Sequence, residues 1–172
     1  MKLALIVLAS VAGLVIVLGV IAAAIGALLP RAHEVSRSVV LAAGAADVYA
    51  AISDREHAPS WRPDLQRVEI LGLQNGRLHF REHGAHGSVT YEVVDAVPDR
   101  TLVTRIVDQD LGYSGSWTYV LTPQGGGTTL TITEKGDVSN VIFRFMSRFV
   151  FGHTRTIDTY LAALSRHMQT AS

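Results

Sequence analysis

The segment from residue 138 to residue 168 constrains the fold of this chain more than any other. Its apolar residues recur at helical spacing, at Ile142, Phe145, Met146, Phe149, Ile157, Tyr160, Leu161 and Leu164. Such a stripe buries one side of a helix against an apolar surface. Residues 36–135 are instead typical of short strands with one small helical insert. Together these patterns predict an antiparallel sheet curled around a final helix, and Gly152 predicts a break between a shorter helix and the main one.

The predicted sheet has about seven strands. They cover residues 36–41, 66–73, 77–82, 88–96, 101–107, 114–122 and 128–134. Asn75-Gly76 between two apolar stretches is a strong hairpin signal. Residues 45–52 have helical composition, and residues 54–63 favour a short helix or turn. The fold class is therefore α+β, and the space between the sheet and its covering helix is where apolar ligands bind.

Residues 3–29 contain no charged side chain. A run of this length can cross a bilayer as a helix, and it exceeds the apolar region of a signal peptide. A cleaved signal is the alternative, because Ala22-Ala23-Ala24 offers a cleavage site. We expect an uncleaved single-pass anchor and linker over residues 1–32 and one domain over residues 33–172. Residues 31–35 are expected to connect the anchor to the first strand.

The orientation of this anchor is only weakly specified. Lys2 lies on one side, and Arg31 and Arg37 lie on the other. We expect a cytoplasmic N-terminus and a domain on the outer face of the cell membrane. Small residues four apart, such as Gly19 and Ala23, could pair two anchors in a homodimer, although such residues are common in membrane helices generally.

Composition excludes several classes of function. The formal net charge is zero and no basic run is present, so nothing indicates a nucleic-acid partner. The chain has no cysteine, which excludes disulfides and thiolate chemistry. It has no phosphate-binding loop, dinucleotide fingerprint or nucleophile elbow. No cofactor is expected.

Several stretches resemble the START/Bet v 1-like superfamily, whose large bacterial branch is called polyketide cyclase/dehydrase or SRPBCC. The stretches are SVVL (38–41), DVYAAISD (47–54), PSW (59–61), WTYVLTP (117–123) with GGT (126–128), and TITEKG (131–136). The resemblance extends over about residues 36–168, and it departs at Ala43-Gly44-Ala45, where a proline or a good N-cap is usual. It implies a helix-grip fold with a deep cavity for lipids, sterols, polyketides or other hydrophobic molecules. Because members include carriers, receptors and cyclases, it does not settle the function.

Two groups of polar residues are candidates for chemistry. His79, His83 and His86 cluster, but glycines and an alanine interrupt the last two, so we expect solvated turn histidines and no metal site. His153 shares the helical stripe and is either an acid, base or ligand contact or a core histidine with one hydrogen bond. Glu92, Arg105 and Glu134 are charges inside strands. They form either a cross-strand pair of Arg105 with one glutamate or a solvated convex face.

The candidate ligand-binding residues combine large aromatic side chains with these polar groups. They are Trp61, Tyr91, Arg105, Trp117, Tyr119, Glu134, Phe149, His153, Ile157 and Tyr160. Three hypotheses follow. The first is a membrane-anchored protein that binds a hydrophobic small molecule or lipid. The second is a cyclase- or dehydratase-like enzyme that uses His153 with Glu134 or Tyr119. The third is an interaction protein with a filled cavity.

Overall fold

The computed structural model describes residues 2–85, 87–152 and 154–170. In chain order its elements are α1 (Lys2–Leu28), β1 (Ala32–Leu41), α2 (Ala45–Ser53), the 3-10 helix η1 (Ala58–Ser60), β2 (Leu65–Gln74), β3 (Arg77–Gly84), β4 (Gly87–Val97), β5 (Thr101–Ile106), β6 (Tyr113–Gln124), β7 (Gly127–Val138), α3 (Val141–Met146), the π-helix η2 (Ser147–Phe151) and α4 (Arg155–Thr170).

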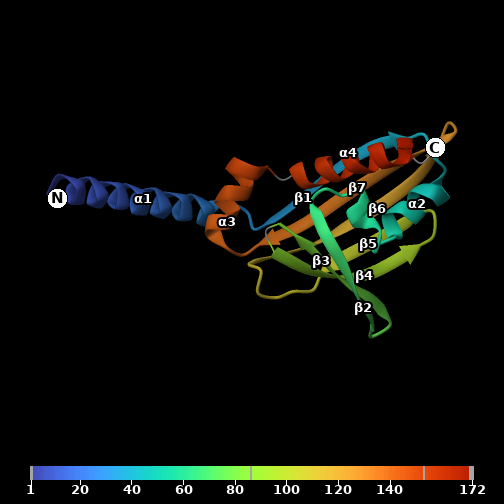
Figure 1. Cartoon of the computed structure of the whole chain (residues 1–172), viewed down its shortest axis with the longest axis horizontal. Coiled ribbons are helices and arrows are strands. Elements are labelled where there is room, and N and C mark those ends of the chain that lie inside the picture. Colours follow the sequence, from blue (N-terminus) through green and yellow to red (C-terminus); the bar gives the residue numbers. More distant parts are fainter. Residues whose placement is uncertain (1, 86, 153, 171–172) are drawn as a thin grey trace.

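The seven strands form one antiparallel sheet in the order β1-β7-β6-β5-β4-β3-β2. Strands β2 to β7 follow one another as neighbours, and β1 closes the order by pairing with β7. The sheet curves around α4, which lies along it in Figure 1. Register shifts in β2 and β4 add to the curvature, since a β-bulge bends its strand. The predicted helix-grip architecture is confirmed.

The core lies between the sheet and the inward faces of α2 and α4. Alternation along β7 buries Thr128, Leu130 and Ile132 completely. The apolar side chains that pack with β7 in this core come from α2 (Val48 and Ile52) and from α4 (Ile157, Tyr160, Leu161, Leu164 and Met168). The part of the predicted stripe that follows Gly152 is therefore buried, as expected.

The part of the stripe before Gly152 behaves differently. No residue of α3 is buried, and Phe149 in η2 is 60% exposed. Gly152 ends this segment with a φ of 72°, a conformation that favours glycine. The predicted break is confirmed, but the prediction of one continuous buried stripe is wrong for residues 142–149. The physical reason is that α3 packs against α1 and lies away from the sheet core.

Strand β1 begins earlier than the sequence indicates. It starts at Ala32, and Ala32 and His33 pair with Asp137 and Gly136 of β7. The prediction of a linker over residues 31–35 is therefore wrong. The reason is that β7 continues to Val138 and supplies backbone partners for the extra residues.

Helix α1 projects away from the domain (Figure 1). Its 27 residues span about 40 Å, and by length and composition it could cross a membrane, a property that a signal sequence shares. Its last turns contact α3. A Cβ at the buried Gly26 would overlap the carbonyl group of Val141, and Arg144 donates a hydrogen bond to the Leu29 carbonyl oxygen across 2.9 Å.

Candidate functional site

A cavity of about 550 Å³ lies between the concave face of the sheet and the C-terminal helices. At one end its walls are buried side chains, including Arg55, Phe80 and Tyr119. At the other end its walls include the exposed residues Phe143 of α3 and Gly152. We call these the inner end and the outer end. The outer end is next to the helix that contacts α1.

A buried ion-pair network closes the inner end. Arg62 precedes β2 and is 8% exposed; it donates hydrogen bonds to Glu82 of β3 across 2.7 Å and to Asp64 across 2.6 Å. Its guanidinium also lies over the ring of Tyr160, 5.2 Å from the centroid. Burial alone disfavours the charged form of Arg62, but Glu82 and Asp64 outweigh that cost and raise its pKa. Arg62 is therefore permanently charged and held in place.

Arg55 lines the same end of the cavity but lacks such compensation. It is 6% exposed, and its guanidinium lies 4.8 Å from the centroid of the Phe80 ring. Its Nη2 atom is buried without a hydrogen-bond partner among the described residues. No carboxylate in that part of the chain lies within 4.0 Å of its guanidinium. The inner end thus has a buried cation that lacks a carboxylate partner, although its guanidinium interacts with the neighbouring Tyr119 hydroxyl.

Aromatic side chains form the wall above these arginines. Tyr160 of α4 contacts Trp61, Trp117 and Tyr119, with ring centroids 5.3 to 5.8 Å apart. Phe80 stacks on Tyr91 at 5.4 Å. These contacts fix the rings and give the cavity a rigid apolar surface.

The tyrosine hydroxyls at this end are neutral at physiological pH. Burial raises the pKa of Tyr119, although the positive charges of Arg55 and Arg62 act in the opposite direction. Burial raises the pKa of Tyr160 well above its ordinary value, and the neighbouring Tyr119 adds to the effect. Burial likewise raises the pKa of Tyr91. These groups can donate hydrogen bonds but cannot act as bases there.

A second polar group lies on the wall nearer the outer end. Glu134 of β7 accepts a hydrogen bond from the Trp117 indole across 2.8 Å, and its other oxygen lies 3.3 Å from His33 Nε2. Gly136 makes room for the imidazole, because a Cβ there would overlap the His33 ring. The pairing of His33 with Gly136 in the β1–β7 register explains this approach. A histidine and a carboxylate in contact on a cavity wall can exchange a proton with a bound molecule.

Four of the predicted site residues line the cavity: Tyr91, Trp117, Tyr119 and Glu134. Tyr160 and Trp61 pack behind this lining, and Ile157 is fully buried in the core. Phe149 lies in the exposed segment beside the outer end. His153 falls outside the described residues.

Arg105 lies on the other face of the sheet. Its register partner on β4 is Glu92, and its guanidinium donates hydrogen bonds to that carboxylate, one of them from Nε across 2.8 Å. Arg77 also donates to Glu92, across 3.3 Å. The cross-strand pair is confirmed, and Arg105 is not among the residues that line this cavity. Residues opposite each other on two strands share a face, and the neighbouring pair of Tyr91 and Ile106 faces the cavity instead.

Burial of the Glu92 carboxyl by itself would raise its pKa. The hydrogen bonds from Arg105 and Arg77 outweigh burial and hold the pKa below its ordinary value. Glu92 is therefore ionised at neutral pH, and its role in this pair is structural.

The structure describes two of the three clustered histidines. His79 and His83 lie on β3, where His83 contacts Glu69 across 3.3 Å and Ser88 across 2.7 Å, while His86 is not among the described residues. Within residues 2–85, 87–152 and 154–170, no group of three metal-binding side chains could hold a metal ion.

Arg55, Arg62, Glu82 and His33 were not among the predicted site residues. The two arginines occupy a polar, proline-containing segment that is typical of a surface loop. The sequence nevertheless held a signal for buried arginines. The segment between Arg55 and Arg62 contains the apolar residues Ala58 and Trp61, and it must cover one end of the sheet. His33 was assigned to the linker, so its place on a strand was missed.

Comparison with known proteins agrees with this architecture. A family model described as polyketide cyclase / dehydrase and lipid transport matches residues 32–169. None of the curated proteins matches the chain. Three solved structures with the same fold illustrate its range, and at these identities each likeness concerns the fold alone.

The first structure is the di-domain aromatase/cyclase StfQ from the steffimycin biosynthetic pathway, with 13% identity and a TM-score of 0.65. The match covers 81% of this chain and 51% of StfQ, so this chain spans about half the length of that protein. A START superfamily protein from Mycobacterium smegmatis has 19% identity, with 81% of this chain and 99% of that chain covered and a TM-score of 0.62.

The third is the Zhui aromatase/cyclase from Streptomyces sp. R1128, with 17% identity, 80% and 94% coverage and a TM-score of 0.62. The family model covers most of the sequence and the whole sheet-and-helix domain. This chain therefore belongs to the polyketide cyclase / dehydrase and lipid transport family.

Proposed function

We propose that this chain is a membrane-anchored protein that binds a hydrophobic small molecule or lipid between its sheet and α4. The observation that carries the proposal is the position of the cavity. Its outer end is bordered by Phe143 of α3, and α3 packs against the last turns of the apolar helix α1. A molecule that leaves the bilayer beside α1 would meet the entrance of the cavity directly.

The segment around this entrance has the composition of a membrane-surface helix. Ile142, Phe143, Phe149 and Val150 are each at least 39% exposed, and Arg144 and Arg148 alternate with them along the chain. Exposed apolar groups beside basic residues favour the boundary between lipid headgroups and acyl chains. The interior of the cavity is suited to the same ligand class, since the rings of Phe80, Tyr91, Trp117 and Tyr119 line it.

Native mass spectrometry of the full-length protein, released from detergent micelles, tests the proposal. We expect a co-purifying apolar molecule, or uptake of an added lipid probe such as oleic acid. Ile106→Trp should reduce the bound fraction, because Ile106 lines the cavity and the indole would fill part of it. The matched control is Val120→Trp, on a side chain that is 40% exposed and outside the cavity lining.

The proposal fails if the wild-type protein carries no molecule and takes up neither oleic acid nor its neutral analogues. It also fails if Ile106→Trp and Val120→Trp bind the probe equally well. An interaction protein with a functionally closed cavity would then be the better description.

A second candidate function is favoured by the contact between His33 and Glu134. An acid–base pair on a cavity wall is what a cyclase- or dehydratase-type reaction requires. If this function is correct, Glu134→Gln should abolish turnover of a polyketide-like substrate while the molecule still binds. Equal turnover by wild type and Glu134→Gln would remove this candidate.

A further inference from the structure

We propose that the inner end of the cavity binds the carboxylate of a single-chain amphiphile, of the fatty-acid class, with Arg55 as its ion-pair partner. This inference rests on the proposed function and adds the chemistry of the ligand head group. The apolar chain would extend from Arg55 along the aromatic wall to the outer end beside α3.

The argument begins with an imbalance between two neighbouring arginines. Arg62 has two carboxylate partners, Glu82 and Asp64, at 2.6 to 2.7 Å. Arg55 is at least as well buried, yet the described residues offer its guanidinium no ion pair, and its Nη2 has no hydrogen-bond partner. A buried, uncompensated charge costs several kcal/mol in general, and a ligand anion would remove that cost.

The neighbouring groups select a hydrogen-bond acceptor as the ligand head. Tyr119 lines the cavity with Arg55 and its neutral hydroxyl can donate to an acceptor, while the Tyr160 hydroxyl behind this lining is buried without a hydrogen-bond partner in the described part of the chain. A donor-rich site of this kind suits a carboxylate. Its two oxygens can accept hydrogen bonds from two N–H groups along one edge of the guanidinium. The ring of Phe80 beneath Arg55 keeps water from the opposite side of the guanidinium.

The charge balance favours a monoanion over a phosphate. Within the described inner end, Arg55 is the cation that lacks a carboxylate partner, and Glu82 is already neutralised by Arg62. A phosphate monoester with nearly two negative charges would need a second free cation. One carboxylate matches one free guanidinium.

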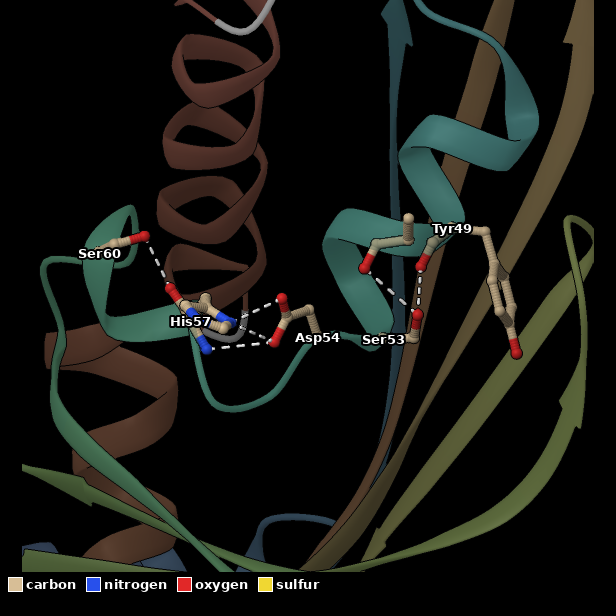
Figure 2. Close-up of polar contacts among 6 residues, drawn as sticks. Tyr49, Ser53, Asp54, His57 and Ser60 are labelled. Atoms are coloured by element: carbon tan, nitrogen blue, oxygen red, sulfur yellow. Dashed lines mark hydrogen bonds and ion pairs between the residues drawn. The ribbon is translucent and has the colours of Figure 1, made fainter.

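The loop that carries Arg55 is held in a fixed shape, as Figure 2 shows for its neighbours. The preceding Asp54 carboxylate contacts both the backbone N–H and the ring Nδ1 of His57, at 3.2 and 2.9 Å. At the end of α2, the Ser53 hydroxyl donates a hydrogen bond to the Tyr49 carbonyl oxygen. The Ser60 hydroxyl donates a hydrogen bond to the His57 carbonyl oxygen. These bonds fix the backbone on both sides of Arg55 before a ligand arrives, which favours binding.

The test compares three probes that share one chain, namely oleic acid, methyl oleate and oleyl alcohol. Each is added to the delipidated full-length protein and the bound fraction is measured by native mass spectrometry. We expect oleic acid to bind about tenfold more tightly than either neutral analogue. Arg55→Met should remove this preference, whereas the control Arg100→Met, on an exposed turn, should keep it.

A second measurement detects the ion pair itself. The carbon-13 resonance of carboxyl-labelled oleate, followed during a pH titration, should give a pKa below that of the free acid when the ligand is bound to the wild-type protein. Arg55→Lys should retain part of this shift, because lysine keeps the charge but loses the planar pair of donors. Unliganded Arg55→Met should melt no lower than wild type, since it removes an uncompensated buried charge, so loss of binding would not reflect unfolding.

The inference is overturned if the neutral analogues bind as tightly as oleic acid to the wild-type protein, or if Arg55→Met binds oleic acid as wild type does. In either case the cavity still binds an apolar molecule, and the proposed function stands. If none of the three probes binds, the proposed function itself fails.

Discussion

The Arg62 guanidinium donates a hydrogen bond to the Glu82 carboxylate across 2.7 Å and thereby ties the segment before β2 to the C-terminal part of β3. Both side chains are nearly excluded from solvent. The pair sits at the inner end of the cavity, so it closes that end without contributing a free charge. The stability of the domain and the shape of the site therefore depend on the same contact.

Glu82→Gln should destabilise the domain by about 1–3 kcal/mol, because it removes a charge-assisted hydrogen bond and leaves Arg62 with Asp64 alone. Chemical denaturation of the full-length protein measures the change. The control is Glu34→Gln, since Glu34 is 60% exposed and its contact with Lys135 is 3.5 Å long. That exposed pair should contribute only about 0–1 kcal/mol. Equal losses for the two variants would contradict the role assigned to Glu82.

The Glu92 pair on the outer face should give the domain a pH-dependent stability. The pKa of Glu92 is below its ordinary value of 4.5 in the folded protein, so the folded state binds fewer protons than the unfolded state as the pH falls. Its contribution is present above about pH 4.5 and is lost as the pH falls through the folded-state pKa.

The melting temperature of Glu92→Gln should therefore be lower than that of wild type by a constant amount between pH 6 and pH 8. The gap should narrow below about pH 4.5. Thermal melts across this range measure it. A gap that widens on acidification would contradict this account of Glu92.

Gly136→Ala should displace the His33 ring and weaken its contact with Glu134, because the new methyl group would overlap the imidazole. The expected loss is about 1–3 kcal/mol of stability. The nitrogen-15 resonance of the Trp117 indole should shift as well, since that group donates to the same carboxylate. Gly13→Ala, which has open space around it, provides the control and should leave both readouts unchanged.

The exposed segment beside the outer end should contact lipid. Because the chain has no cysteine, Phe149→Cys introduces a single labelling site for an environment-sensitive fluorophore. In lipid nanodiscs this label should emit at shorter wavelength than the same label at Gln124→Cys, which lies at the exposed end of β6. Matching spectra at the two positions in nanodiscs would argue against a membrane-facing entrance.

Local patterns were sufficient for most of the secondary structure. Alternation of apolar residues and the Asn75-Gly76 turn predicted the strands of the sheet, because side-chain period and turn chemistry are properties of adjacent residues. The helical stripe predicted that Ile157 and Leu164 would be buried, and they are. The start of β1 was missed because residues 32–35 become a strand only through their pairing with β7.

The site was harder to predict than the fold. Aromatic candidates such as Trp117 and Tyr119 follow from their alternation on a strand, and they do line the cavity. Arg105 also stands on a strand but lies on the opposite face, because side chains alternate along β5 and the register places Thr104 and Ile106 toward the cavity.

The sequence by itself determined the class of this protein: an apolar helix, a meander of strands and a final amphipathic helix, all encoded by local periodicity. Only the tertiary structure decided which charges are buried and which of them are compensated. Arg55 and Arg62 look alike in the sequence and both line the cavity, yet packing brings Glu82 from β3 to Arg62 and no carboxylate of the described residues to Arg55. Burial and charge pairing depend on residues far apart in the chain, so they are decided by the assembled fold.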